Sequence, residues 1–392
     1  MTYKFLTNEY QKIPNNTILY YYTMKRKDGQ SDMKKRIGIL TSGGDCPGLN
    51  ATIRGVAKAC YEKMGTDNVE IVGISNGYYG LIHNLCRDMK PEEFSGILTR
   101  GGTILGTKRQ PFKMMQVIGD DKIDKVKNMK ETYKKQKLDC LLTLGGNGTH
   151  KTSYLLASEG LNVIGLPKTI DNDIFGTDVT FGFHSAVDIA TDAIDRLHTT
   201  ANSHSRILLC EIMGNKAGWL TLNAGIAGGA DIILIPEIPY DIEKVCQSVV
   251  KRNESGKNFS IVAVAEGAFD QDEAKMKKKE RARLRAEAGM TTATNRIAAQ
   301  IQNMTGLEAR VCVPGHMLRG GSPSAYDRIL ATQFGVHAAK LISQGKYGRS
   351  VAKIGGKITS NKLEDIAGKT KFVSPDDQLV TTARNLGVSF GD

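Results

Sequence analysis

The chain has 392 residues, of which 40% are hydrophobic and 24% are charged, the ordinary composition of a globular protein with room for two domains. Its net charge of +12 suits a nucleic acid or an anionic small molecule, but the basic stretches 25–36 and 275–285 lack the interleaved aromatic residues that stack on bases. No apolar run approaches the length of a membrane span, so we expect neither a nucleic-acid nor a membrane partner.

The cysteines and the N-terminus both indicate a cytoplasmic location. The seven cysteines are odd in number, no pair has CxxC spacing, and most lie in apolar runs, which predicts buried, reduced thiols. The apolar stretch 18–22 is too short to be the core of a signal peptide. Residues 1–32 are polar and lack clear periodicity, so we expect an appended, mobile N-terminal segment ahead of Met33.

Two glycine-rich loops occur early in the chain. The first predicted strand, residues 37–40, leads into the loop 41–48 and then a helix. A second glycine-rich loop, residues 100–109, ends in Lys108 and Arg109. Glycines beside cations suit a polyphosphate, although a loop with incidental surface charge is about as plausible when this segment is viewed alone.

A strand–helix–strand unit follows, with strands at 138–144 and 163–167 and a helix at 149–159. This order predicts parallel strands with a right-handed crossover. In parallel sheets, ligands bind beyond the carboxyl ends of the strands. Both loops of the unit, 145–149 and 168–173, are expected at that edge.

The chemistry of these two loops is complementary. The first has three glycines in four residues just before a helix, which suits a phosphate cradle. For one such loop alone a plain tight turn is the usual structure, but two such loops at one sheet edge favour a binding site. The second places Asp171 and Asp173 beside Lys168. One carboxylate there can accept a hydroxyl proton while its neighbour holds Mg²⁺, although either aspartate could instead cap a helix.

Strands and helices continue to alternate through the rest of the chain, which predicts an α/β protein with parallel sheets. No Pro-rich linker separates the halves, so we expect two domains that interleave. Further strands are expected at 69–75, 206–213, 232–236, 260–265 and 309–313, and further helices at 184–200, 217–227, 241–251, within 270–302 and at 326–343.

Polar residues recur at the ends of the later strands. Arginines there suit bidentate phosphate binding, and a glutamate can accept hydrogen bonds from sugar hydroxyls. Taken singly, Arg310 and Glu266 fit salt bridges or caps better. As a set, the residues predict a second anion site facing the first; they are Arg206, Met213, Gly214, Glu266, Arg310, His316 and Arg319.

Together these stretches resemble the 6-phosphofructokinase family. The similar segments run in family order between residues 33 and 342 and include ILTSGGDCPGLNATIRG, RGGTILGTKR, LGGNGT, GLPKTIDNDI and PGHMLRGGSPSAYDR. The resemblance implies phosphoryl transfer to the 1-hydroxyl of fructose 6-phosphate, giving fructose 1,6-bisphosphate in glycolysis. It also implies a Mg²⁺ requirement, a cytoplasmic homotetramer and possible allostery.

The resemblance also implies a fold class: α/β, with two interleaved Rossmann-like domains whose mainly parallel sheets are flanked by helices. The donor-binding domain is expected at residues 33–182 plus 319–368. The sugar-phosphate-binding domain is expected at 183–318 plus 369–392.

The resemblance assigns expected roles to single residues. Asp171 matches the catalytic base, with Thr169 and Arg109 as the other catalytic residues. Asn147 and Asp173 are expected at the metal. The expected donor-binding residues are Gly44, Lys108, Arg109, Gly146, Asn147, Gly148 and Thr149. The expected sugar-phosphate-binding residues are Thr169, Ile170, Asp171, Arg206, Met213, Gly214, Asn215, Glu266, Arg310, His316, Met317, Leu318 and Arg319. Within this set, Arg206 and Arg310 are expected to reach a neighbouring subunit's site.

The chain departs from the family pattern at positions that bear on activity. Asn147 stands where ATP-dependent members usually carry a metal-associated aspartate, and Asn215 stands where an arginine usually follows Met-Gly. Lys216 can partly compensate for that arginine. A catalytically silent regulatory subunit is therefore one alternative. A kinase of another family with a similar glycine-rich loop is a more remote alternative.

The identity of the phosphoryl donor depends on two positions. Pyrophosphate-dependent relatives usually carry an aspartate where this chain has Gly148, and such an aspartate would crowd and repel the α-phosphate of ATP. Lys168 instead favours pyrophosphate, because pyrophosphate-dependent members carry lysine there. Since an added cation helps either donor bind, we expect ATP, with a pyrophosphate-dependent enzyme as the alternative.

Overall fold

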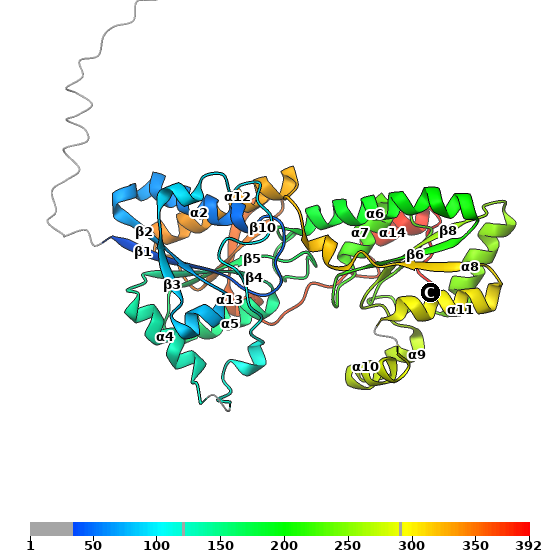
Figure 1. The fold of residues 1–392 in the computed structure, drawn as a ribbon, viewed down its shortest axis with the longest axis horizontal. Coiled ribbons are helices and arrows are strands. Elements are labelled where there is room, and N and C mark those ends of the chain that lie inside the picture. The colour runs from blue at the N-terminus through cyan, green and yellow to red at the C-terminus, as the bar shows by residue number, and fades with distance from the viewer. Residues whose placement is uncertain (1–33, 120–121, 290–291) are drawn as a thin grey trace, which may run out of the picture. The chain divides into compact units, whose positions relative to one another are not determined.

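The computed structural model describes residues 34–119, 122–289 and 292–392 (Figure 1). The expected N-terminal segment 1–32 lies outside the described residues. Residues 35–392 make up one unit by their internal contacts, and this unit contains two separate β-sheets.

The larger sheet has seven strands in the order β11-β10-β5-β4-β1-β2-β3. Its five inner strands run parallel, while β3 and β11 pair antiparallel at the two edges. Apolar runs such as IGIL form the inner strands because both faces of a parallel sheet are covered. The strands are β1 (Lys35–Thr41), β2 (Val69–Ile74), β3 (Cys86–Met89), β4 (Cys140–Gly145), β5 (Val163–Pro167), β10 (Arg349–Ile354) and β11 (Lys357–Lys362).

Helices cover both faces of this sheet (Figure 1). Ile37 and Ile39 of β1 belong to the cluster that includes α2 (Leu49–Met64) and α12 (Ala325–Ser343). Leu40, pointing the other way, joins the cluster of the opposite face, as expected from strand alternation. That face is covered by α3 (Tyr78–His83), α4 (Lys125–Lys135) and α5 (Asn147–Ser158), with α13 (Leu363–Ile366) beside α5.

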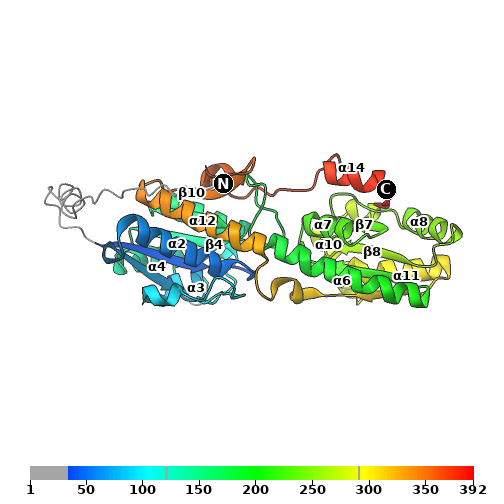
Figure 2. The same cartoon turned by 90° about the horizontal axis from the view of Figure 1, so that it is seen from above.

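Two glycines allow α2 and α12 to cross closely, and Figure 2 shows the two helices side by side. A Cβ built on Gly55 would come within 3.0 Å of the carbonyl oxygen of Thr332, and one on Gly335 within 2.6 Å of that of Thr52. A larger residue at either position would therefore push the helices apart.

The smaller sheet has four parallel strands in the order β7-β8-β6-β9. They are β6 (Ile207–Ile212), β7 (Ile232–Leu234), β8 (Ser260–Ala265) and β9 (Ala309–Cys312). The cores on its two faces contain side chains of α6 and α7, and of α8 and α11. The helices of this region are α6 (Phe183–His204), α7 (Trp219–Ala227), α8 (Ile242–Glu254), α9 (Gln271–Ala274), α10 (Lys278–Glu287), α11 (Ala293–Thr305) and α14 (Gln378–Asn385).

The expected fold class, α/β with mainly parallel sheets, is confirmed. The predicted helical stretch 270–302 is three helices, because Lys275 and Ala288 end the first two. Three strands have no counterpart among the predicted elements: β3, β10 and β11. The boundaries proposed for the two domains stay a prediction.

Short 3-10 helices complete the secondary structure: η1 (Thr66–Asn68), η2 (Pro91–Phe94), η3 (Phe112–Met114) and η4 (Gly315–Arg319). Across the described parts of the chain, no helix has the length and apolar character that crossing a membrane requires.

Candidate active site

A cavity of about 380 Å³ opens at the carboxyl ends of β1, β4 and β5. The loops after these three strands, which the sequence predicted to share one sheet edge, all contribute to its walls. The predicted site residues that line the cavity are Gly44, Arg109, Gly146, Asn147, Gly148, Thr149, Lys168, Thr169, Asp171, Asp173, Asn215 and Arg319. Ser42, Gly43, Gln110, Pro111 and Phe112 also line it and were not among the predicted residues.

The glycine-rich loop after β4 leaves a helix start open to the cavity. α5 begins at Asn147, and its N-cap residue, Gly146, offers no side chain to the first free N–H groups. Gly145 must be glycine, because an added Cβ would lie 2.1 Å from Oγ1 of Thr149. Nothing lies within 4 Å of a Cβ built on Gly148, so the space beside this loop is open. Such a helix start attracts anions.

Asp171 is a buried carboxyl group with an unsatisfied oxygen. Its residue surface is 9% exposed, and its Oδ1 atom has no hydrogen-bond partner. Burial, aided by the nearby charge of Asp173 and opposed by Arg319, raises the pKa of Asp171 from 3.8 to about 6. A carboxylate of this kind is suited to accept a proton near neutral pH.

Thr169 holds the backbone beside Asp171. Its Oγ1 accepts a hydrogen bond from the Asp171 amide at 3.0 Å, and its carbonyl oxygen accepts one from the Thr180 hydroxyl at 2.7 Å. These bonds fix the turn that carries the carboxylate into the cavity. Ile170, between them, has no exposed surface and packs into the core instead of lining the cavity.

Asn147 bonds directly to Asp173. Its Nδ2 donates to Oδ2 of Asp173 at 2.9 Å and to the Asp173 carbonyl oxygen at 3.2 Å. Burial raises the pKa of Asp173, and the bond from Asn147 opposes that rise. An aspartate at position 147 would place a second carboxylate against Asp173. The asparagine therefore keeps the loops after β4 and β5 together without charge repulsion.

The oxygen atoms around the two aspartates fit a Mg²⁺ ion. Mg²⁺ in phosphoryl-transfer sites takes one or two carboxylates, several waters and substrate phosphate oxygens. Asp173, the amide oxygen of Asn147 and the unpartnered Oδ1 of Asp171 are donors of that kind. No group of three or more His, Cys, Asp or Glu side chains arranged for a metal occurs within 34–119, 122–289 or 292–392.

Two cations link the loop after β1 to the rest of the cavity. The Lys168 side chain is buried, which lowers its pKa, and its Nζ donates to the carbonyl oxygen of Gly44. Nη1 of Arg319 donates to the carbonyl oxygen of Asp45 at 3.2 Å. Lys108, expected at the donor, instead lies over the ring of Tyr79, with 3.7 Å from its Nζ to the ring centroid, and does not line this cavity.

Several of the expected sugar-binding residues lie outside the 380 Å³ cavity. Oε1 of Glu266 accepts hydrogen bonds from the amides of Gly214 and Asn215 at 3.2 and 2.6 Å, so this glutamate holds the turn after β6. His316 and Met317 are exposed on η4, outside the 380 Å³ cavity. Leu318 has no exposed surface and supports η4 from the core.

Arg206 and Arg310 lie at the amino ends of the strands of the smaller sheet, whereas Glu266 lies beyond the carboxyl ends. They sit at the amino ends of β6 and β9, where Glu308 binds both; Nε of Arg206 donates to Oε2 of Glu308 at 2.7 Å. A six-residue strand is about 20 Å long, so a single chain does not bring these arginines to the cavity that holds Asp171. Their expected role in a neighbouring subunit's site stays a prediction.

A parallel α/β sheet whose carboxyl edge combines an open helix start with buried aspartates is typical of enzymes that bind phosphate groups. The family model described as phosphofructokinase matches residues 36–342. The chain therefore belongs to the phosphofructokinase family.

Relatives at high identity cover nearly the whole chain. It is 57% identical over 361 residues to the ATP-dependent 6-phosphofructokinase of Spirochaeta thermophila, covering 91% of this chain and 98% of the relative. It is 47% identical to ATP-dependent 6-phosphofructokinase 3 of Bacteroides thetaiotaomicron, covering 91% and 100%. Among solved structures, the phosphofructokinase of Pichia pastoris is 31% identical with a TM-score of 0.74, covering 87% of this chain but only 38% of that longer chain.

Proposed function

We propose that this protein is an ATP-dependent 6-phosphofructokinase that transfers the γ-phosphoryl group of ATP to the 1-hydroxyl of fructose 6-phosphate. The observation that carries the proposal is one cavity in which the open start of α5 faces the unpartnered carboxylate of Asp171. The relatives at 57% and 47% identity, both named ATP-dependent 6-phosphofructokinases, support the reaction and the donor.

The residues divide the work of phosphoryl transfer, which depends on alignment and charge neutralisation more than on covalent help. The free N–H groups at the start of α5 and the guanidinium of Arg109 hold the donor phosphates. Asp171 accepts the proton that leaves the sugar hydroxyl, and Thr169 keeps that carboxylate in place. Asp173 and the amide oxygen of Asn147 would hold Mg²⁺, which would neutralise charge on the donor phosphates.

The geometry around the donor loop supports ATP over pyrophosphate. The space next to Gly148 is open, which leaves room for the α-phosphate and nucleoside of ATP. Lys168, the residue that favoured pyrophosphate in the sequence, is buried and donates to the backbone of Gly44. It therefore supports the loop after β1.

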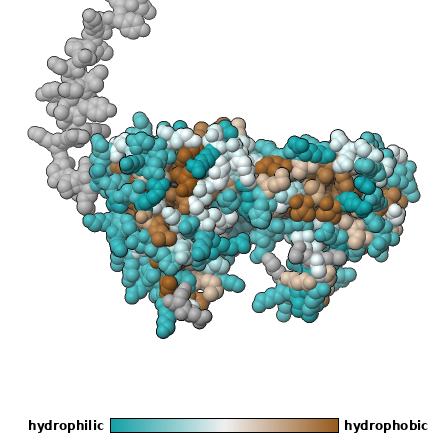
Figure 3. Space-filling view, in the orientation of Figure 1, coloured by the Kyte–Doolittle hydropathy of each residue, from teal (hydrophilic) through white to brown (hydrophobic). Residues whose placement is uncertain are grey.

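We also propose that the active form is a homo-oligomer, with Arg206 and Arg310 completing a neighbouring subunit's sugar-phosphate site. Both arginines lie at the sheet edge away from their own chain's Glu266. Apolar residues appear among the polar ones on the surface in Figure 3, and α12 exposes Ile329 and Val336 at 62% and 48%. Exposed apolar surface of this kind is common at oligomer interfaces.

A coupled assay of the purified full-length protein tests this function. ATP and pyrophosphate are each supplied with fructose 6-phosphate at equal free Mg²⁺. We expect turnover with ATP and a higher kcat/KM for ATP than for pyrophosphate. A higher kcat/KM for pyrophosphate would identify the alternative enzyme, and no turnover with either donor would favour a regulatory subunit.

A further inference from the structure

A second, larger cavity of about 860 Å³ adjoins the one that holds Asp171. The two cavities share Asn215 as a lining residue, and Glu266 lies in the wall of the larger one. Lys216, Arg281 and Arg285 bring positive charge to the larger cavity. Two of these cations, Arg281 and Arg285, come from α10, which largely coincides with the basic stretch 275–285.

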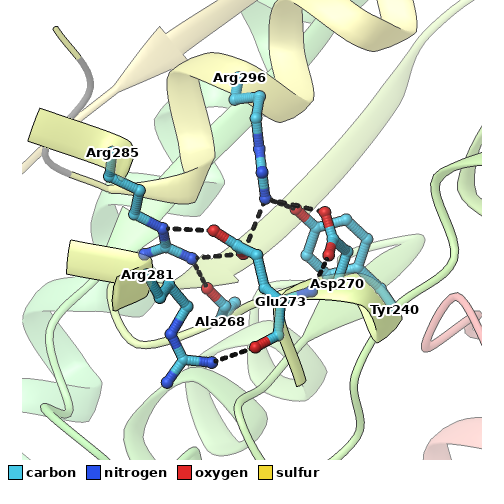
Figure 4. A network of polar contacts seen from close by, with 7 residues as sticks. All are labelled: Tyr240, Ala268, Asp270, Glu273, Arg281, Arg285 and Arg296. Atoms are coloured by element: carbon cyan, nitrogen blue, oxygen red, sulfur yellow. Dashed lines mark hydrogen bonds and ion pairs between the residues drawn. The ribbon is translucent and has the colours of Figure 1, made fainter. Parts of the chain in front are cut away.

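A buried glutamate of α9 links α10 to α11 (Figure 4). Glu273, 5% exposed, accepts hydrogen bonds from Nε and Nη2 of Arg285 at 2.8 and 2.7 Å. Nη2 of Arg296 also donates to Glu273, at 2.8 Å. Arg285 donates further to the carbonyl oxygen of Ala268 at 2.8 Å. Arg285 and Arg296 together occupy both carboxylate oxygens of Glu273. These bonds hold α10 in place, and Glu273 has no oxygen left for Arg281.

Arg281 is held differently from its neighbours. Its guanidinium lies over the ring of Phe269, 4.0 Å from the centroid, and Nη1 approaches only the carbonyl oxygen of Glu273, at 3.4 Å. Within the described residues, no ion pair joins Arg281 to a carboxylate. Glu273 and Asp270 pair with Arg285 and Arg296, so Arg281 keeps its guanidinium free of a carboxylate partner within the described residues. The carboxylates of Glu237 and Glu266 also line the cavity, but backbone amides hold them.

We propose that Arg281 binds the phosphate group of the sugar substrate, as a cation supplied by α10 to the cavity that Asn215 and Glu266 line. This inference rests on the proposed function and adds a residue to its sugar-phosphate site. A guanidinium stacked on an aromatic ring is pre-oriented, and its remaining N–H groups match the oxygens of a phosphate dianion. Among the described residues, no other unpaired arginine lines this cavity. Asn215 is neutral, and Arg206 and Arg310 are bound to Glu308 elsewhere.

The test compares Arg281→Gln and Arg281→Lys with a matched control. Arg283→Gln removes a guanidinium from the same helix, where Arg283 is 64% exposed and paired with Glu287. Each full-length variant is assayed for its KM for fructose 6-phosphate and for ATP. The Kd for fructose 6-phosphate is measured by calorimetry without ATP, together with Tm.

Losing one charge-assisted bond to the sugar phosphate should raise both the Kd and the KM for fructose 6-phosphate roughly 10- to 100-fold in Arg281→Gln. The KM for ATP should stay within about twofold of wild type, because the donor binds elsewhere. Arg281→Lys should fall between wild type and Arg281→Gln, and Arg283→Gln should match wild type.

Three results would overturn the inference while leaving the proposed function intact. The first is an unchanged affinity for fructose 6-phosphate in Arg281→Gln. The second is an equal loss in Arg283→Gln, which would indicate only a general electrostatic effect. The third is a parallel loss of affinity for both substrates with a lowered Tm, which would make Arg281 structural. Failure of the wild-type protein to bind or phosphorylate fructose 6-phosphate would instead refute the proposed function itself.

Discussion

Replacing Asp171 by asparagine should make the protein more stable at neutral pH while removing most of its activity. The pKa of this buried carboxyl is raised from 3.8 to about 6. Between these two pH values the folded chain keeps a proton that the unfolded chain has released. The contribution of Asp171 to stability is therefore present at low pH and is lost as the pH rises through about 6.

The size of this effect follows from the shift. About two pKa units correspond to about 3 kcal/mol of stability that ionised Asp171 removes at pH 7. An asparagine avoids the buried charge, but its amide N–H groups would lack partners in place of Oδ1, which costs about 1–2 kcal/mol. A net gain of about 1–2 kcal/mol is expected, while loss of the general base lowers kcat by about 10²- to 10⁴-fold.

The assay compares Tm values of wild type and Asp171→Asn in EDTA, without nucleotide or sugar, at pH 4.5 and pH 7.5. The variant's advantage should be clear at pH 7.5 and shrink at pH 4.5, where the wild-type carboxyl is protonated. Asp67→Asn, at an exposed aspartate of η1, is the control, and its Tm should match that of wild type. A variant that is less stable than wild type at pH 7.5, or that keeps wild-type kcat, would refute the reasoning.

Three further predictions concern the metal, the donor and the oligomer. Asn147→Asp places a carboxylate where Nδ2 now lies 2.9 Å from Asp173, so the Mg²⁺ concentration at half-maximal rate should fall roughly 10-fold; an unchanged or raised requirement would remove position 147 from the metal site. Gly148→Asp fills the open space beside the donor loop and should lower kcat/KM for ATP at least about 10-fold, whereas equal kinetics of variant and wild type would show that ATP lies elsewhere. Arg206→Ala and Asp171→Asn should each be nearly inactive alone, but co-refolded mixtures should recover up to about a quarter of wild-type activity through shared sites; no recovery in mixed oligomers would place Arg206 outside the neighbouring subunit's site.

The parts of the fold visible in the sequence were those with local signals. The inner strands β1, β4 and β5 could be predicted from continuous apolar runs, because these strands are buried on both faces. β11, with the sequence KITSNK, has no large apolar stripe, and only pairing with β10 makes it a strand. β10 in turn pairs with β5, almost two hundred residues earlier, as Arg349 lies opposite Ile164. Pairing over such distances leaves no local pattern to read.

In the candidate site, too, the features with local sequence signals could be predicted and those set by long-range packing could not. The loops after β4 and β5 could be placed at one edge because parallel strands share their direction. Burial could not be predicted: Ile170 and Leu318 stand inside motif segments but belong to the core. The predicted strands 206–213 and 309–313 already placed Arg206 and Arg310 at strand beginnings, but only the structure shows that Glu308 binds both arginines. The contact of Arg281 with Phe269 joins two elements that share no motif.

The most direct measurement of the central claim follows the phosphoryl group itself. Purified full-length protein is mixed with ATP, Mg²⁺ and fructose 6-phosphate, and the products are identified by ³¹P NMR. We predict ADP and a sugar carrying phosphates on both C1 and C6, formed at a rate that Asp171→Asn reduces by about two orders of magnitude or more. Absence of the bisphosphate, or its formation from pyrophosphate but not from ATP, would contradict the account.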